Sequence, residues 1–233
     1  MESPPPPRRQ TKKEQQSEAS IEAILQAAKY LFVTKGFHGT RIDDIASRVG
    51  LTKGAVYFHF EDKIAILKVL LDRVRNDILD PLAEKLGNST ESPSERLMVL
   101  LSHGASIVSK DPIAVLLPIV IAIEFKATDD GIGKYVHAGY QRLARMLEHV
   151  LQEGIAAGEF RSDISAREQA YVLVALNDGM MLTWLRNNKN LDGITFLRQV
   201  RSTLWHAISA PGLITKTAKR NAELPSVELP VIE

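Results

Sequence analysis

Hydrophobic positions repeat with the period of an α-helix along most of the 233-residue chain. From Ile21 onward, apolar residues recur three and four positions apart, which puts them on one face of a helix that Gly36 should end. No run alternates with the period of two that a half-buried strand requires. The pattern predicts an all-α protein with long helices over residues 61–86, 94–109, 112–126, 131–157, 165–188 and 192–209.

The two ends of the chain differ in composition from the helical part. Residues 1–17 combine four consecutive prolines with four basic residues, so a disordered basic tail is expected there. Such a tail either stays solvated or lies as an arm along a DNA groove. A second flexible tail is expected over residues 211–233.

Residues 40–63, TRIDDIASRVGLTKGAVYFHFEDK, predict two short helices joined by a tight turn. Thr40 is expected to cap the first helix and Thr52 the second, because threonine oxygens accept hydrogen bonds from the first-turn amides. Gly50 supplies the left-handed residue of the turn, and Ala46 is small where the helices cross. This is the pattern of a helix-turn-helix, whose second helix can enter a DNA major groove.

The exposed face of the second helix and its flanks hold the residues expected to contact DNA. Tyr57 and His59 have hydrogen-bonding groups that reach phosphate oxygens, and Lys63 adds a positive charge at the start of the next helix. The alternative is an ordinary helical hairpin in which Tyr57 and Phe60 are core aromatics. The expected DNA-binding residues are Thr40, Arg41, Thr52, Lys53, Gly54, Ala55, Tyr57, His59 and Lys63.

Residues 18–64 closely resemble the DNA-binding domain of the TetR family of bacterial transcriptional regulators. In that family the recognition helix ends in a Tyr-x-His/Tyr-Phe pattern that a lysine closely follows. Tyr57, His59, Phe60 and Lys63 match this pattern. The resemblance implies a nine-helix homodimer that binds palindromic, double-stranded operator DNA.

For the rest of the chain the resemblance implies a domain order and a mode of regulation. The helix-turn-helix domain would span 18–64, with a linking helix over 61–86, and a ligand-binding and dimerisation domain would span 65–210. The implied function is a repressor that a small, largely apolar effector releases from DNA. Two alternatives stay open: a constitutive DNA-binding protein that acts through a protein partner, and a transcriptional activator.

The segment YVLVALNDGMMLTWLR carries a small-residue face. Ala175 and Gly179 lie four residues apart, so another helix can approach closely there. The resemblance assigns the last two helices to a four-helix bundle between two protomers. Packing inside one protomer is the alternative.

The middle helices are apolar with a few interspersed polar residues, a composition that suits a small-molecule cavity. For each apolar residue there, ordinary core packing is the competing interpretation. The expected ligand-binding residues are Leu101, His103, Leu117, Ile121, Glu124, His137, Asn177, Met181 and Trp184.

Charge and residue types narrow the function classes further. The formal net charge is only +1; residues 1–80 hold 13 Lys/Arg against 11 Asp/Glu, which supports DNA binding only mildly. The chain has no cysteine, its six histidines show no metal-ligand spacing, and no nucleophile elbow occurs. We therefore expect no enzyme activity, no cofactor and no metal. With neither a signal peptide nor a membrane-spanning segment, a cytoplasmic protein without a membrane partner is expected.

Overall fold

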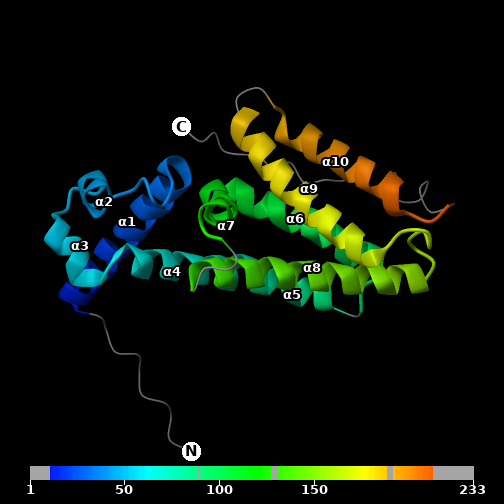
Figure 1. The fold of residues 1–233 in the computed structure, drawn as a ribbon, viewed down its shortest axis with the longest axis horizontal. Helices are drawn as coiled ribbons and strands as arrows, with labels where there is room; N and C mark the ends of the chain where they lie inside the picture. The colour runs from blue at the N-terminus through cyan, green and yellow to red at the C-terminus, as the bar shows by residue number, and fades with distance from the viewer. Residues whose placement is uncertain (1–10, 89, 127–130, 188–190, 212–233) are drawn as a thin grey trace, which may run out of the picture. The chain divides into compact units, whose positions relative to one another are not determined.

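The computed structural model describes residues 11–88, 90–126, 131–187 and 191–211, except for the side chains of residues 101, 102, 104–106, 108, 109 and 185. This part of the chain contains nine helices when α4, the π-helix η1 and α5 are counted as one continuous helix, and it contains no strand (Figure 1). The expected all-α architecture is therefore confirmed. The described helices include none that is long and apolar enough to cross a bilayer.

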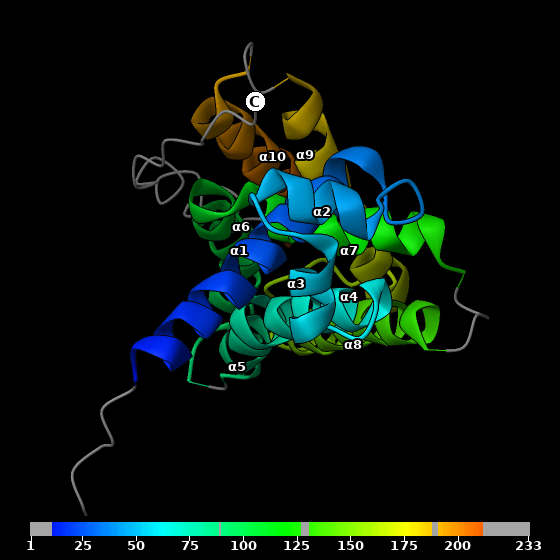
Figure 2. The same cartoon turned by 90° about the vertical axis from the view of Figure 1, so that its left-hand side faces the viewer.

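The chain divides into two compact units, Met1–Leu70 and Leu71–Glu233. The first contains α1 (Lys12–Lys35), α2 (Ile42–Arg48), α3 (Lys53–His59) and the beginning of α4 (Lys63–Val74). In this unit α2 packs against both α1 and α3, as Figure 2 shows from the side of these helices. Its core is formed by side chains at most 3% exposed: Ile24, Leu25, Ala28, Phe32, Ile45, Ala46, Val56, Ile66, Leu67 and Leu70.

The first helix begins earlier than the sequence pattern predicted. A capping box at Thr11 and Glu14 starts α1, so the expected tail over residues 1–17 is wrong from Lys12 onward. The first turns are polar and exposed, and hydrophobic periodicity therefore does not reveal them. Residues 1–10 lie outside the described part. The helix ends at Gly36 with φ 83°, as expected.

The second unit contains the rest of α4, η1 (Arg75–Leu79) and α5 (Asp80–Gly87). The sequence predicted one helix over 61–86, and the three segments follow one another without a break. The π-helical turn lies directly before Pro81, whose ring would collide with a carbonyl of a regular α-helix. The wider π turn accommodates the proline and leaves the helix continuous.

Five further helices complete the second unit: α6 (Pro93–Lys110), α7 (Pro112–Glu124), α8 (Ile132–Ala156), α9 (Ala166–Asn187) and α10 (Gly193–Ile208). Their bounds agree with the predicted ranges to within two residues. The side chains of Ser92 and Asp111 cap α6 and α7, each followed by a proline at the first helical position. The expected C-terminal tail lies outside the described residues from 212 onward.

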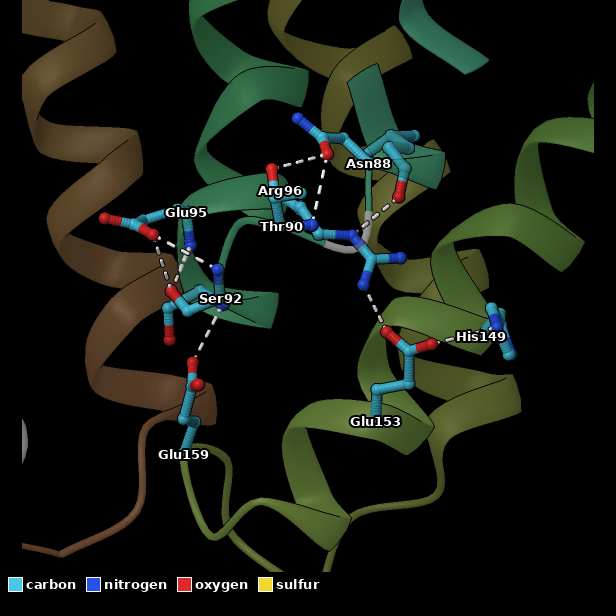
Figure 3. A network of polar contacts seen from close by, with 10 residues as sticks. Asn88, Thr90, Ser92, Glu95, Arg96, His149, Glu153 and Glu159 are labelled. Atoms are coloured by element: carbon cyan, nitrogen blue, oxygen red, sulfur yellow. Dashed lines mark hydrogen bonds and ion pairs between the residues drawn. The ribbon is translucent and has the colours of Figure 1, made fainter. Parts of the chain in front are cut away.

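A buried arginine joins three helices of the second unit. Arg96 of α6 is 4% exposed; its Nε donates to the carbonyl oxygen of Leu86 at 2.7 Å, and its Nη1 pairs with Glu153 of α8. The other oxygen of Glu153 lies 3.0 Å from Nε2 of His149 (Figure 3). This network fixes α5 and α6 against α8.

Candidate functional site

The first unit presents a helix-turn-helix with its second helix anchored from one side. The amide of Leu51 donates to the carbonyl of Ala46 at 2.9 Å, and Gly50 has φ 69°, the left-handed conformation that the turn requires. The Thr52 hydroxyl accepts from the amide of Ala55 at 3.2 Å and caps α3 as predicted. Val56 at 0% and Phe60 at 8% exposure hold α3 to the core, so its opposite face is available for DNA.

The structure places most of the expected DNA-binding residues of α3 on this free face. Thr52, Lys53 and Gly54 are exposed and Tyr57 is 47% exposed, whereas Ala55 and His59 are half-buried. A Cβ atom added at Gly54 would meet nothing closer than 3.9 Å, so the fold itself does not require glycine there. The absence of a side chain at this position leaves room for the backbone to approach DNA closely.

Phe58 is a residue of this face that the sequence interpretation missed. It is 81% exposed, the largest exposure among the exposed large hydrophobic side chains of the described residues. An exposed phenyl ring forgoes roughly 1.5–3 kcal/mol that burial would provide, so packing within the unit does not explain it. Phe58 lies two positions from both Val56 and Phe60, which puts it on the opposite side of α3. That spacing could have identified it as an exposed residue of the face opposite the core.

Lys53 is the only lysine or arginine in α3. Its Nζ lies 3.0 Å from Oδ2 of Asp43 on α2, and this hydrogen bond raises the pKa of Lys53. Both side chains are about half exposed, so a phosphate or a base edge can replace Asp43 as the partner of Lys53. Arg41, another expected contact, is exposed at the start of α2, and its amide donates to Asp44 at 2.8 Å.

Thr40 has a different role from the predicted one. It is 1% exposed, and its hydroxyl donates to the carbonyl oxygen of Gly36 at 2.7 Å. Arg41, not Thr40, occupies the N-cap position of α2. The prediction of a helix cap and a DNA contact at Thr40 is therefore corrected: its hydroxyl closes the connection between α1 and α2.

Lys63 also turns inward, against the expectation of a phosphate contact. Its Nζ donates to the carbonyl oxygens of Phe37 at 2.6 Å and Thr40 at 2.7 Å, and it lies 4.2 Å from the centre of the Phe37 ring. Charge-assisted bonds of this kind are among the stronger ones in proteins. Lys63 thus links the start of α4 to the α1–α2 connection and stabilises the first unit.

This role predicts a characteristic response to mutation. We expect Lys63→Met to lower the free energy of unfolding by about 1–3 kcal/mol, because two backbone carbonyls lose a charged donor. Binding to all DNA sequences should weaken together, without a change in the slope of log affinity against log salt. The matched variant Lys53→Ala should instead lower that slope by about one per protomer. An unchanged melting temperature with a reduced slope in Lys63→Met would restore the phosphate assignment.

The second unit contains a cavity of about 280 Å³ that the end of α4, η1, α5 and the helices α6 to α9 line. Its wall is mostly apolar, with polar groups from η1, α6, α8 and α9. Among the expected ligand-binding residues it includes His103, Asn177 and Met181. It also includes residues that the sequence interpretation missed: Arg75, Tyr135, Tyr140, Arg142 and Asp178.

The remaining predicted ligand residues lie elsewhere. Leu117 and Ile121 are fully buried and Trp184 is 4% exposed, and all three pack in the core outside the cavity wall. Glu124 is half-buried at the end of α7, and His137 is exposed, with Nε2 2.8 Å from Nε2 of Gln141. These five assignments are corrected. The side chain of Leu101 lies outside the described residues.

The polar groups of the cavity are largely uncharged or paired. His103 places Nε2 3.0 Å from the carbonyl oxygen of Ile78, and burial lowers the pKa of His103. Because a carbonyl only accepts, Nε2 carries the proton. Burial raises the pKa of both Tyr140 and Asp178, which hydrogen-bond to each other. Tyr135 donates to Asp72 at 2.7 Å, and burial raises its pKa to about 12.

The raised pKa of Asp178 predicts a pH dependence of stability. The folded protein holds this proton more tightly than the unfolded chain, so stability falls as the pH rises from 3.8 through the raised pKa. We expect the advantage of Asp178→Asn over the wild type to grow with pH across that window in urea unfolding. Asp163→Asn is a control in which the pH dependence should have the opposite sign, because the hydrogen bond to Arg161 lowers the pKa of Asp163. A difference between Asp178→Asn and the wild type that is independent of pH would contradict the burial of a carboxyl group.

Comparison with known families gives matches in both units. Residues 24–70 match the model of bacterial regulatory proteins of the tetR family. Residues 120–194 match the model of the tetracyclin repressor-like C-terminal domain. The described residues include no group of three or more histidine or acidic side chains suited to a metal ion.

Individual relatives span most of the chain. The transcriptional repressor BepR of Brucella suis is 30% identical over 215 residues, which cover 83% of this chain and 93% of BepR. The crystal structure of the MbdR regulator from Azoarcus sp. CIB has a TM-score of 0.73 and 36% identity, and covers 80% of this chain and 97% of MbdR. A complex of SmeT, a repressor from Stenotrophomonas maltophilia, with triclosan has a TM-score of 0.65 at 22% identity; it covers 92% of this chain and all of SmeT.

Proposed function

Because the chain belongs to the TetR family of bacterial transcriptional regulators, we propose that this DNA-binding regulator is a ligand-controlled repressor. It binds a palindromic operator as a homodimer and leaves it when a small, largely apolar effector enters the cavity. It is not an enzyme, as the family consists of DNA-binding regulators. The proposal places it in the cytoplasm, where the DNA is.

The free face of α3 is the observation that carries the proposal. Val56 and Phe60 fix the helix to the core, while the side chains of Lys53, Tyr57 and Phe58 are exposed. These three side chains offer a cation, a hydroxyl group and an apolar ring within one helix, and a major groove presents phosphates, base edges and thymine methyl groups in the same space.

A two-fold operator requires two copies of α3, and α9 offers a surface for pairing. Val172 is 53% exposed, and Ala175 and Gly179 on the same face are also exposed. Small and apolar residues at this spacing let a second helix approach closely. The two half-sites should then lie roughly 34 Å apart or somewhat more. Light scattering that gave a monomer still bound to DNA would remove the dimer from the proposal.

Effector control requires that the cavity influence the binding helix. Leu71 and Val74 of α4 line the cavity, and Lys63 at the other end of the same helix holds the α1–α2 connection. A tilt of this one helix can therefore change both sites. SmeT, of the same fold, is known in complex with triclosan, which supports a small-molecule effector here. Couplings between two sites are typically 1–3 kcal/mol, so we expect operator affinity to fall about 5- to 150-fold.

A reporter gene placed behind an operator that the protein binds tests whether the protein represses or activates transcription. A repressor lowers reporter transcription when the protein is expressed, and the effector restores it. Increased transcription would identify an activator. Repression that no small molecule relieves, together with equal effector affinity with and without operator, would favour the constitutive protein that acts through a partner.

A further inference from the structure

The cavity of the second unit has two chemically different edges. Successive residues of a helix turn by about 100°, so Tyr140 and Arg142 point to nearly opposite sides of α8. Tyr140 hydrogen-bonds to Asp178 on α9. Arg142 pairs with Asp80 of α5, with 2.7 Å between Nη1 and Oδ1. One edge of the cavity is thus a carboxyl group held by neutral donors, and the other is a guanidinium group.

The arginine edge opens into a second space. Arg75 and Arg142 line both the apolar cavity and an adjoining open depression beside α5. Arg96 and His149 also line this depression, and both are bound to Glu153, as Figure 3 shows. Arg75 and Arg142 therefore line both spaces and, unlike the buried Arg96, are about half exposed beside their carboxylate partners.

Arg75 and Arg142 retain the capacity to bind an anion. Nη2 of Arg75 lies 3.3 Å from Asp72, and its side chain is 43% exposed; that of Arg142 is 51% exposed. A guanidinium has five N–H donors, and each of these ion pairs occupies one nitrogen. The Nε of Arg75 also donates to Oδ1 of Asn76 at 3.3 Å, which leaves its Nη1 available. Carboxylate and phosphate groups are the ligands that such planar, multidentate donors bind best.

We propose that the effector is an amphipathic anion, with its apolar body in the cavity and its carboxylate or phosphate group bound by Arg142 and Arg75. The opposite edge presents the carboxyl group of Asp178 rather than a cation, and this difference sets the direction in which the molecule enters. At about 280 Å³ the cavity lies at the lower end of the usual range for small-molecule sites, so the apolar body is compact. This inference rests on the proposed function, because it names the chemistry of the same effector.

A matched series of probes tests the proposal by calorimetry on the full-length protein. The probes are 4-phenylbutyrate, 4-phenylbutyl phosphate, 4-phenylbutanol and 4-phenylbutylamine, which share one apolar body and differ in the end group. We expect at least one anion to bind about 10-fold or more tighter than the alcohol and the amine. The ratio between the two anions distinguishes a carboxylate effector from a phosphate ester.

Variants separate the arginines from general charge effects. Arg142→Gln and Arg75→Gln should each weaken the preferred anion about 10-fold and leave the alcohol unchanged. Arg145→Gln, an exposed arginine of α8 outside both spaces, is the matched control and should change nothing. Both substituted arginines are about half exposed, so the variants are expected to fold.

Several results would overturn the inference. Preferred binding of the amine, lost in Asp178→Asn, would place a cation at the other edge of the cavity. Equal binding of all four probes, or anion binding insensitive to both arginine substitutions, would remove the anion site. Absence of binding by any probe to a protein that still binds operator would also contradict it. If the wild-type protein bound no operator at all, that result would instead contradict the proposed function.

Discussion

Replacing Lys53 and Tyr57 together by alanine is expected to lower operator affinity roughly 1,000-fold without unfolding the protein. Both side chains of α3 are accessible to DNA, with Lys53 52% and Tyr57 47% exposed. At about 1 kcal/mol for each lost contact, four contacts in the proposed dimer amount to about 4 kcal/mol. Fluorescence anisotropy with labelled operator measures this loss at fixed salt.

The control for this variant is Lys68→Ala, which removes an exposed lysine of α4 in the same unit. It should retain wild-type affinity to within about twofold, because screening makes a distant exposed charge weak at physiological salt. Circular dichroism should show the same helix content in all three proteins. Wild-type affinity in the Lys53/Tyr57 double variant would show that α3 does not read the DNA.

The second large effect is a loss of stability, and it is expected from a substitution at Gly154 near the end of α8. A Cβ atom built on Gly154 would lie 2.2 Å from two ring carbons of Phe160, far inside van der Waals contact. Phe160 is 2% exposed, and its ring packs against Trp205 at 6.1 Å between centroids. Its backbone is bound as well, since the amide of Phe160 donates to the carbonyl of Gly154 at 3.1 Å. The ring therefore has little room to move away.

Gly154→Ala should consequently lower stability by about 2–3 kcal/mol, or the melting temperature by roughly 5–10 °C. Gly87→Ala is the control, because a Cβ atom there meets nothing within 4 Å. Adding Phe160→Leu to Gly154→Ala should cost less than the sum of the two single changes, because a smaller side chain relieves the clash. Additive losses in this cycle, or a wild-type melting temperature in Gly154→Ala, would contradict the close packing.

The helix-turn-helix could be predicted from the sequence because local steric rules determine it. Gly50 is needed for a left-handed turn, and Thr52 caps the helix that follows. The roles of Thr40 and Lys63 could not be predicted in this way. Both depend on carbonyl groups of the α1–α2 connection, which only the folded chain brings within hydrogen-bonding distance.

The cavity was less predictable, because residues of η1 and of the six helices α4 to α9 form it. Hydrophobic periodicity identifies which side chains turn inward, but it does not separate the core positions of Leu117 and Ile121 from the cavity positions of Leu100 and Ile107. The arginines at its edge are half exposed, so a search for buried residues passes over them. Arg75 and Arg142 are 67 positions apart in the sequence, so only the fold shows that both line the same cavity.

Selection of binding sites from a randomised duplex library tests the central claim most directly. The wild-type protein and the Lys53/Tyr57 double alanine variant are each used to enrich the library through several rounds. For the wild type, the account predicts one enriched palindrome whose half-sites lie about one helical turn or slightly more apart. For the variant it predicts no enrichment. Failure of the wild type to enrich any sequence, or enrichment of the same palindrome by the variant, would contradict a regulator that reads DNA through α3.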